Sequence, residues 1–224
     1  MLILLIVLAL AIFVLPNLWA KWVLKRHTRG RDDYPGTGAE LAEHLIRRMG
    51  MEGVRVERTE QGDHYDPEAR CVRLTPDHYD GRSLTAVTVA AHEVGHAIQH
   101  HEGYAPLLAR SRLVRVAQKA EKLGAILMMA APFLFVLTRL PGGLAVVIVM
   151  AVISFGTAAL VHLVTLPVEF DASFNRALPL LKEYVPPADM AGARHVLTAC
   201  AFTYVAASLA SVMNLGRWLV ILRR

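Results

Sequence analysis

The stretch Leu84-Thr-Ala-Val-Thr-Val-Ala-Ala-His-Glu-Val-Gly-His96 decides how the chain around it folds. Its residues before the first histidine are almost all apolar, so we predict a long buried helix over 83–100. On a helix, residues four apart lie on one face, and His92 and His96 have that spacing. Both imidazoles can therefore reach one metal ion. Burying them beside Glu93 without a metal would cost free energy.

The residue types in this motif are those of a catalytic zinc site. Zinc binds imidazole nitrogen, and a catalytic zinc keeps one position open for water. Glu93 follows the first histidine, where it can take a proton from that water as a general base. Gly95 lowers helix stability, so it either leaves space beside the metal or lets another element pack close. The competing interpretation is a helix with two surface histidines and an ordinary glutamate.

A catalytic zinc usually has three protein ligands, and the third must come from outside this motif. His100 is on the same helix but lies too far along it to share the metal. We choose Glu169, in the segment Leu166-Pro-Val-Glu-Phe-Asp-Ala-Ser173, because it directly follows a long apolar segment at whose boundary the polar domain could reach it. His162, inside that apolar segment, is the competing candidate.

Further polar residues are candidates for supporting roles. Asp171 and Ser173 flank Glu169 and suit the orientation of a ligand histidine, or equally the capping of a helix N-terminus. A developing oxyanion calls for a second hydrogen-bond donor. The candidates for that donor, which the sequence leaves unranked, are His195, Tyr204, Arg194 and Arg176.

The composition points to a membrane. The chain has 224 residues, of which 54% are hydrophobic and 19% charged, and its mean hydropathy is +0.39. Soluble domains usually carry about 25% charged residues, so an ordinary soluble enzyme, a disordered chain and a nucleic-acid-binding tail are disfavoured. We therefore expect an integral membrane protein with one modest polar domain.

The distribution of positive charge predicts the orientation in the membrane. Lysines and arginines flank the long polar loop, from Lys21 to Arg31 and from Arg110 to Lys122, and recur at Arg176, Lys182 and Arg194. The positive-inside rule then places both large loops, and with them the zinc domain, on the cytoplasmic face of the membrane. The same charges suit anionic lipid headgroups. We expect the lipid bilayer as a partner and no nucleic acid, and self-association is compatible with the sequence.

Within the polar loop, local signals predict a small α+β unit. Thr37-Gly-Ala-Glu40 is a capping box that opens a helix running to about Met49. The runs Val54–Glu57 and Cys71–Leu74 alternate like strands, with turn residues at 62–67, so we predict a hairpin. The second strand could bind an extended substrate along its edge, or equally serve only as a hairpin strand that covers the core. Cys71 and Cys200 do not form a disulfide framework, and we expect both to be reduced thiols.

These motifs resemble the YugP-type neutral zinc metallopeptidases of prokaryotic membranes. The resemblance is carried by three segments, Asp63-His-Tyr-Asp-Pro67, Val89-Ala-Ala-His-Glu-Val-Gly-His-Ala-Ile-Gln99 and Pro167-Val-Glu-Phe-Asp-Ala-Ser173. It implies a membrane-bound zinc protease with His92, His96 and Glu169 as ligands and Glu93 as the catalytic glutamate. A looser similarity exists to the HtpX and CAAX-prenyl-protease gluzincins, which have aspartate where this chain has Ser173.

The predicted fold is mostly α-helical, with about four membrane-spanning helices and a small α+β zinc-protease domain. We expect five segments: an N-terminal transmembrane anchor at 1–24, a zinc metallopeptidase domain at 25–122, a transmembrane hairpin at 123–166, a loop or helix with the third zinc ligand at 167–197, and a C-terminal transmembrane helix at 198–224.

The predicted activity is hydrolysis of peptide bonds in a peptide or membrane-protein substrate, with Zn²⁺ as cofactor. One alternative is a zinc hydrolase of non-peptide or formyl substrates, in which Cys71 would be the third ligand. Another is a non-catalytic zinc-binding membrane scaffold. Glu93 argues against the scaffold, because a structural zinc site needs no base.

Overall fold

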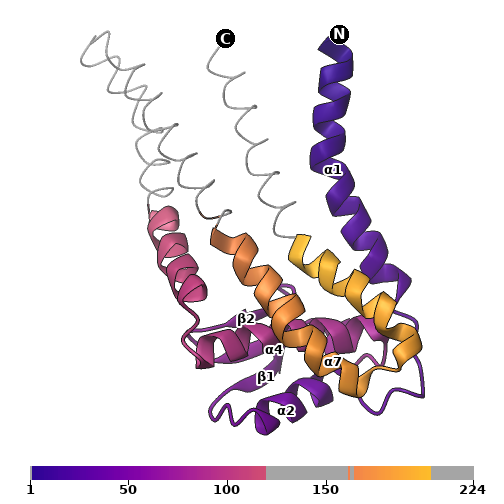
Figure 1. The fold of residues 1–224 in the computed structure, drawn as a ribbon, viewed down its shortest axis with the longest axis vertical. Coiled ribbons are helices and arrows are strands. Elements are labelled where there is room, and N and C mark those ends of the chain that lie inside the picture. The colour runs from indigo at the N-terminus through magenta and orange to yellow at the C-terminus, as the bar shows by residue number, and fades with distance from the viewer. Residues whose placement is uncertain (1, 120–160, 162–163, 203–224) are drawn as a thin grey trace.

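The computed structural model describes residues 2–119, 161 and 164–202, which form a mostly helical fold with one small sheet (Figure 1). The named elements are α1 (Leu2–Arg26), α2 (Gly38–Arg48), β1 (Arg55–Arg58), β2 (His64–Asp66), β3 (Cys71–Leu74), α3 (Pro76–Tyr79), α4 (Leu84–His101), the π-helical segment η1 (Asp171–Ala177), α7 (Leu178–Tyr184) and the 3₁₀ turn η2 (Pro187–Asp189). Residues 105–119, 164–170 and 190–202 are helical as well.

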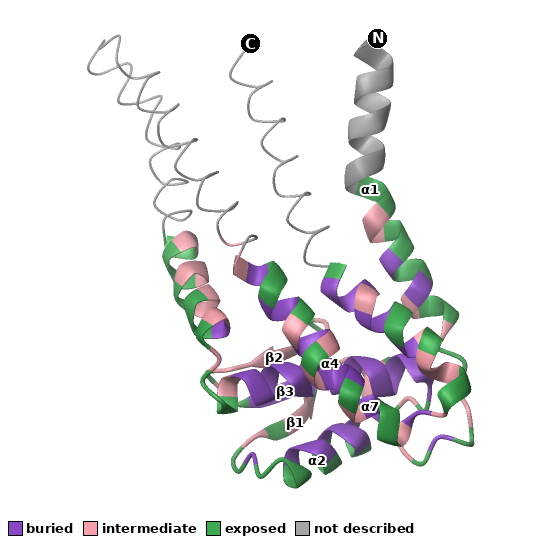
Figure 2. Ribbon diagram, in the orientation of Figure 1, coloured by how far each residue is buried: buried purple, intermediate pink, exposed green. Residues whose placement is uncertain are grey.

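Helix α4 is the centre of the fold. It begins as predicted, because the Ser83 hydroxyl accepts a hydrogen bond from the Ala86 backbone N–H and so caps the first turn. Sixteen of its 18 residues are buried, and Figure 2 shows it covered along almost its whole length. The predicted buried helix is confirmed. Its burial means that every polar side chain on it needs a partner within the protein.

Helix α2 packs against α4. The predicted capping box is present, since the Thr37 hydroxyl accepts from the Glu40 N–H and the Glu40 carboxylate accepts from the Thr37 N–H. Apolar residues of α2 face the core, among them Leu41, Leu45 and Ile46.

The sheet differs from the predicted hairpin. β1 pairs with β3 in parallel, and β2 pairs with β3 antiparallel, which gives the order β1-β3-β2. The hairpin prediction was wrong because part of the stretch we assigned to the turn, His64–Asp66, forms the strand β2. β3 is therefore the central strand with both edges paired, and the expectation that an extended substrate adds to β3 is also wrong. Cys71 in β3 and Cys200 are both buried, and neither is part of a disulfide, as predicted.

Residues 164–184 form a helical run whose middle, η1, is π-helical. η1 lies against α4, and the adjoining α7 contributes Leu178 and Leu181 to the core. π-Helical turns are rare and often occur at functional sites. This one begins two residues after Glu169.

The expectation of membrane-spanning helices needs correction. In the part of the chain that the structure describes, no helix is both long and apolar enough to cross a membrane. The predicted anchor at 1–24 does form a helix, α1, which contains Pro16. Most of the predicted hairpin at 123–166 and of the helix at 198–224 lies outside the described residues.

Candidate metal centre

Two elements bring the three predicted zinc ligands together. His92 and His96 project from the same face of α4, with their ring centroids 4.8 Å apart. Glu169 comes from the helical run that packs across α4, just before η1. One potential ligand atom from each residue lies within 4.8 Å of the others, and all three residues are buried. Among the described residues this is the group of His, Cys, Asp and Glu side chains that could hold a metal ion.

The three side chains face one another through specific atoms. The Glu169 Oε2 atom is 3.4 Å from His92 Nε2 and 3.3 Å from His96 Nε2. Neither carboxylate oxygen has a hydrogen-bond partner among the described residues, although the side chain is fully buried. A buried carboxylate without hydrogen bonds is costly, so its charge needs another source of stabilisation.

Gln99 fixes the tautomer of His96. The Gln99 Nε2 group donates to the Val168 carbonyl at 2.8 Å and to the Asp171 carboxylate at 2.8 Å, both of which only accept. Its Oε1 atom must then be the one 3.0 Å from His96 Nδ1. The proton of His96 is therefore on Nδ1, and the Nε2 lone pair points toward Glu169.

Ser173 does the same for His92. The Ser173 Oγ atom lies 3.0 Å from His92 Nδ1, and its hydroxyl donates to the Leu197 carbonyl at 3.4 Å. Since the serine proton is used on Leu197, the oxygen accepts from Nδ1–H of the imidazole. His92 thus also presents an Nε2 lone pair to the carboxylate.

Two nitrogen lone pairs and a carboxylate oxygen converging at these distances repel one another unless a positive charge lies between them. Burial raises the pKa of the Glu169 carboxyl. Positive charge on His96 and His92 would outweigh this effect and bring the pKa well below its usual range. A divalent cation supplies that charge while leaving Nδ1–H of both imidazoles in place. The donor set of two imidazoles and one carboxylate fits a catalytic zinc ion.

Glu93 lies beside this cluster and is also buried. Burial raises the pKa of its carboxyl above the usual range, although the nearby His92 and His96 act in the opposite direction. A raised pKa suits a group that takes up and releases a proton near neutral pH.

Gly95 explains how the two elements come so close. A Cβ atom at this position would lie 2.6 Å from the backbone oxygen of Ala172 in η1. Of the two explanations offered for this glycine, the structure therefore favours the close approach of another element. The backbone that follows Glu169 rests directly on the helix that carries the histidines.

The residues predicted to support the site lie at different distances from the three proposed ligands. Asp171 contacts Gln99, the residue that orients His96. Its carboxylate accepts hydrogen bonds from Gln99 and, at 2.6 Å, from Arg176 Nε. His195 is exposed and lines a cavity of about 400 Å³ beside Trp19 and Trp22, away from the three converging side chains. Tyr204 and His162 lie outside the described residues.

Three further predicted residues lie elsewhere. Arg176 is bound to Asp171 and Glu102, and Arg194 is exposed. The His100 Nδ1 atom is 2.8 Å from the hydroxyl of Tyr65, so this histidine contacts the sheet instead of the ligand cluster.

Sequence reasoning missed two residues near the cluster. Gln99 is three residues after His96 and shares its helix face, a spacing that could have revealed it. Arg110, whose Nη2 atom is 3.8 Å from Glu169 Oε1, gave no such signal because its position depends on how the helix 105–119 packs.

Residues 2–223 match the model of a protein family described as "Putative neutral zinc metallopeptidase". The chain belongs to this family. It is 37% identical over 212 residues to the "Putative membrane protease YugP" of Bacillus subtilis (strain 168), which covers 92% of this chain and 91% of the relative. No solved structure gives a significant match. The cofactor of the metallopeptidase family is zinc, and His92, His96 and Glu169 form a group able to hold it.

Proposed function

We propose that this protein hydrolyses peptide bonds in a zinc-dependent reaction in which Glu93 is the general base. The observation that carries the proposal is the convergence of His92 Nε2, His96 Nε2 and Glu169 Oε2 next to the buried Glu93. The family description supports the same reaction. A bound zinc ion supplies a Lewis acid at the reacting centre.

The residues of the chain divide the remaining work. Nε2 of His92, Nε2 of His96 and the carboxylate of Glu169 would hold the metal. The Glu93 carboxylate takes a proton from the attacking water and passes it to the nitrogen of the leaving amine as the peptide C–N bond breaks. Ser173 and Gln99 keep the imidazole protons on Nδ1 throughout, so the ligand atoms stay available.

The decisive experiment compares the zinc-loaded wild-type protein with Glu93→Gln. Both are incubated with a library of unstructured peptides and with isolated membranes, and the released peptides are identified by mass spectrometry. We expect the variant to keep its zinc and to lose about 10²–10⁴-fold in cleavage rate. Glu43→Gln, at an exposed position on α2, is the matched control and should cleave normally. Equal cleavage by Glu93→Gln and wild type would refute the proposal.

The two alternatives have less support. Formyl hydrolysis with Cys71 as ligand is disfavoured, since the metal-binding group of the described residues includes Glu169 and leaves out Cys71, which lies in the sheet. Unchanged zinc content in Cys71→Ser would exclude it. A non-catalytic scaffold would have no use for a buried carboxylate at position 93.

We further propose that the protein associates with membrane surfaces. The relative from Bacillus subtilis is named a membrane protease. α1 exposes Leu15, Leu18 and Trp22 along one stripe, and Arg26 stacks on Trp22 at 5.1 Å. Indole rings beside basic residues suit the interface of an anionic bilayer. Sedimentation with phosphatidylglycerol vesicles should be weakened by Trp22→Glu, and equal binding of the variant would count against this surface.

A further inference from the structure

Arg110 approaches the metal centre from an element that carries none of the proposed ligands. It lies on the helix 105–119, which follows α4 after a turn at Gly103, where φ is +67°. The Nη2 atom of Arg110 is 3.8 Å from Glu169 Oε1. The Arg110 side chain is 20% exposed, whereas that of Glu169 is 0% exposed. A cation that solvent can still reach therefore lies at the edge of a buried site.

The two oxygens of Glu169 have different neighbours. Oε2 faces the imidazoles of His92 and His96, and Oε1 faces Arg110. A separation of 3.8 Å is too long for a hydrogen bond, and Glu169 Oε1 has no hydrogen-bond partner in the part of the chain that the structure describes. The contact between Arg110 and Glu169 is therefore electrostatic. The guanidinium does not hold the carboxylate in position by a hydrogen bond.

Two of the cations that the sequence offered for the oxyanion, Arg176 and His195, do not contact the three proposed ligands. Arg176 donates to Asp171 at 2.6 Å and to Glu102 at 2.7 Å, which ties it to the support of the site. His195 lines the cavity beside Trp22. Among the ion pairs of the described residues, one joins an arginine to a proposed ligand, and that arginine is Arg110.

We propose that Arg110 is a catalytic residue that donates a hydrogen bond to the scissile carbonyl oxygen as negative charge develops on it. The inference rests on the proposed peptide hydrolysis and supplies the second donor which that reaction needs. A guanidinium is permanently charged, and its planar fork can face a carbonyl oxygen while remaining attracted to Glu169. Such a donor stabilises the transition state more than the ground state.

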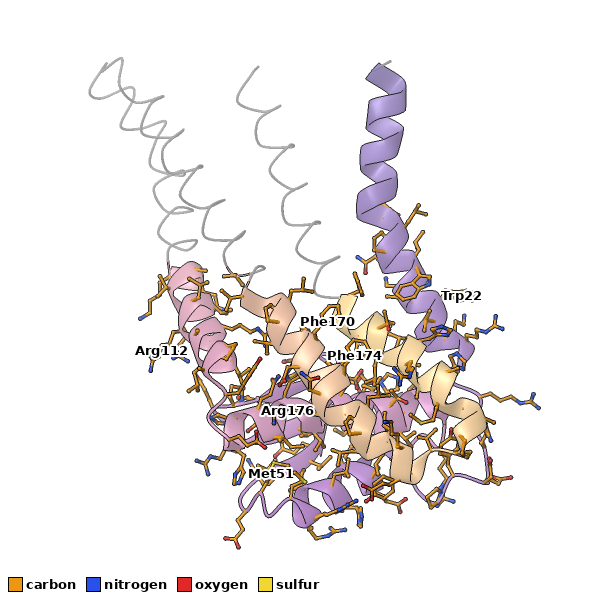
Figure 3. All side chains as sticks on the ribbon, in the orientation of Figure 1. Trp22, Met51, Arg112, Phe170, Phe174 and Arg176 are labelled. Atoms are coloured by element: carbon orange, nitrogen blue, oxygen red, sulfur yellow. The ribbon has the colours of Figure 1, made fainter. Side chains whose placement is uncertain are left out.

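The competing role is purely structural, in which Arg110 neutralises Glu169 and so maintains the metal site. The two roles separate in zinc affinity and in the binding of a phosphonamidate peptide, whose tetrahedral phosphoryl group carries the charge of the developing oxyanion. Arg112→Ala is the matched control, because Arg112 is exposed on the same helix and points away from α4 in Figure 3.

The experiment measures four quantities on Arg110→Ala, Arg110→Lys, Arg112→Ala and wild type. They are the zinc Kd by chelator competition, phosphonamidate binding by calorimetry on the zinc-loaded protein, and kcat and KM on a cleaved peptide. For Arg110→Ala we expect kcat and phosphonamidate affinity to fall about 10²–10³-fold, with zinc Kd and KM nearly unchanged. Arg110→Lys should recover part of both losses. Arg112→Ala should match wild type.

Two results would overturn the proposal. One is a loss of zinc affinity in Arg110→Ala that accounts for the lost activity, and the other is unchanged phosphonamidate binding and kcat. Arg110→Gln keeps much of the apolar stem and replaces the alanine variant if that fails to fold. Glu93→Gln, assayed in parallel, distinguishes failure of one proposal from failure of the other. Normal cleavage by Glu93→Gln would refute the hydrolytic role of Glu93. An inactive Glu93→Gln together with a fully active Arg110→Ala would refute only the role of Arg110.

Discussion

Ser173 Oγ lies 3.0 Å from His92 Nδ1, and both side chains are buried. A serine orients the ring without adding a negative charge, because its own proton goes to the Leu197 carbonyl and its oxygen accepts from the imidazole. The site thus keeps Glu93 and Glu169 as its buried carboxylates and holds His92 with a neutral group.

Replacing Ser173 by alanine should weaken zinc binding. The change leaves the Nδ1–H of His92 without a buried acceptor and frees the ring to rotate, so we expect zinc affinity to fall about 10–100-fold. Chelator competition measures the Kd. Ser111→Ala is the control, since the Ser111 hydroxyl only bonds the Leu107 carbonyl of its own helix. Equal zinc affinity in both variants would mean that Ser173 does not orient the ligand.

The parts of the fold that depend on local signals were predictable from the sequence. The Ser83 cap and the apolar run of α4 fix the zinc helix, and the spacing of His92 and His96 fixes their common face. Glu169 was reached through its chemistry and its place after an apolar segment, and the structure brings it to the histidines.

The remainder depends on contacts between distant segments. β2 lies in a stretch rich in turn residues, and only its pairing with β3 makes it a strand. No periodicity places Arg110 beside Glu169 either, because that contact depends on the turn after α4 and the packing of another helix. The first predicted span falls on α1, and no helix of the described residues is long and apolar enough to cross a membrane.

Gly95→Ala tests the close packing of α4 on η1. Alanine is the better helix former by about 1 kcal/mol, yet its Cβ would lie 2.6 Å from the Ala172 oxygen. We expect the clash to dominate and to lower the free energy of unfolding by about 1–3 kcal/mol, with weaker zinc binding because Glu169 moves away with η1. Thermal denaturation measures the first effect. Gly30→Ala, where a Cβ would meet nothing within 4 Å, should change little.

Asp63 should make stability depend on pH. Burial raises the pKa of its carboxyl, but the His78 imidazole at 2.8 Å and hydrogen bonds from Thr75 outweigh this, so the pKa lies below its usual value. A lowered pKa means that the stabilisation is complete above the pKa of the unfolded carboxyl, about 3.9, and disappears as pH falls through the lower folded value.

Asp63→Asn should therefore unfold more easily than wild type at pH 7, by about 1–3 kcal/mol. The difference between the two proteins should shrink below about pH 4. Urea denaturation at both pH values measures it. Asp77→Asn is the control, because Asp77 is exposed on α3. A difference that stays constant from pH 7 to pH 3 would show that the carboxylate charge is not the stabilising feature.

Glu169→Gln separates binding of the metal from stability of the fold. The amide keeps the shape of the side chain but removes its charge. Loss of a residue that only orients a metal ligand lowers metal affinity by at least about 10-fold, so loss of a ligand's charge should lower zinc affinity by more than that. Without zinc, the variant should be at least as stable as wild type, since a buried carboxylate with no hydrogen bonds is removed. Zinc at 100 times the wild-type Kd stabilises the wild type by about 2.7 kcal/mol, and at the same zinc concentration the variant should keep no more than about half of that increment. Glu183→Gln, at an exposed pair with Arg48, should keep it. Undiminished zinc binding by Glu169→Gln would assign the third position to another residue.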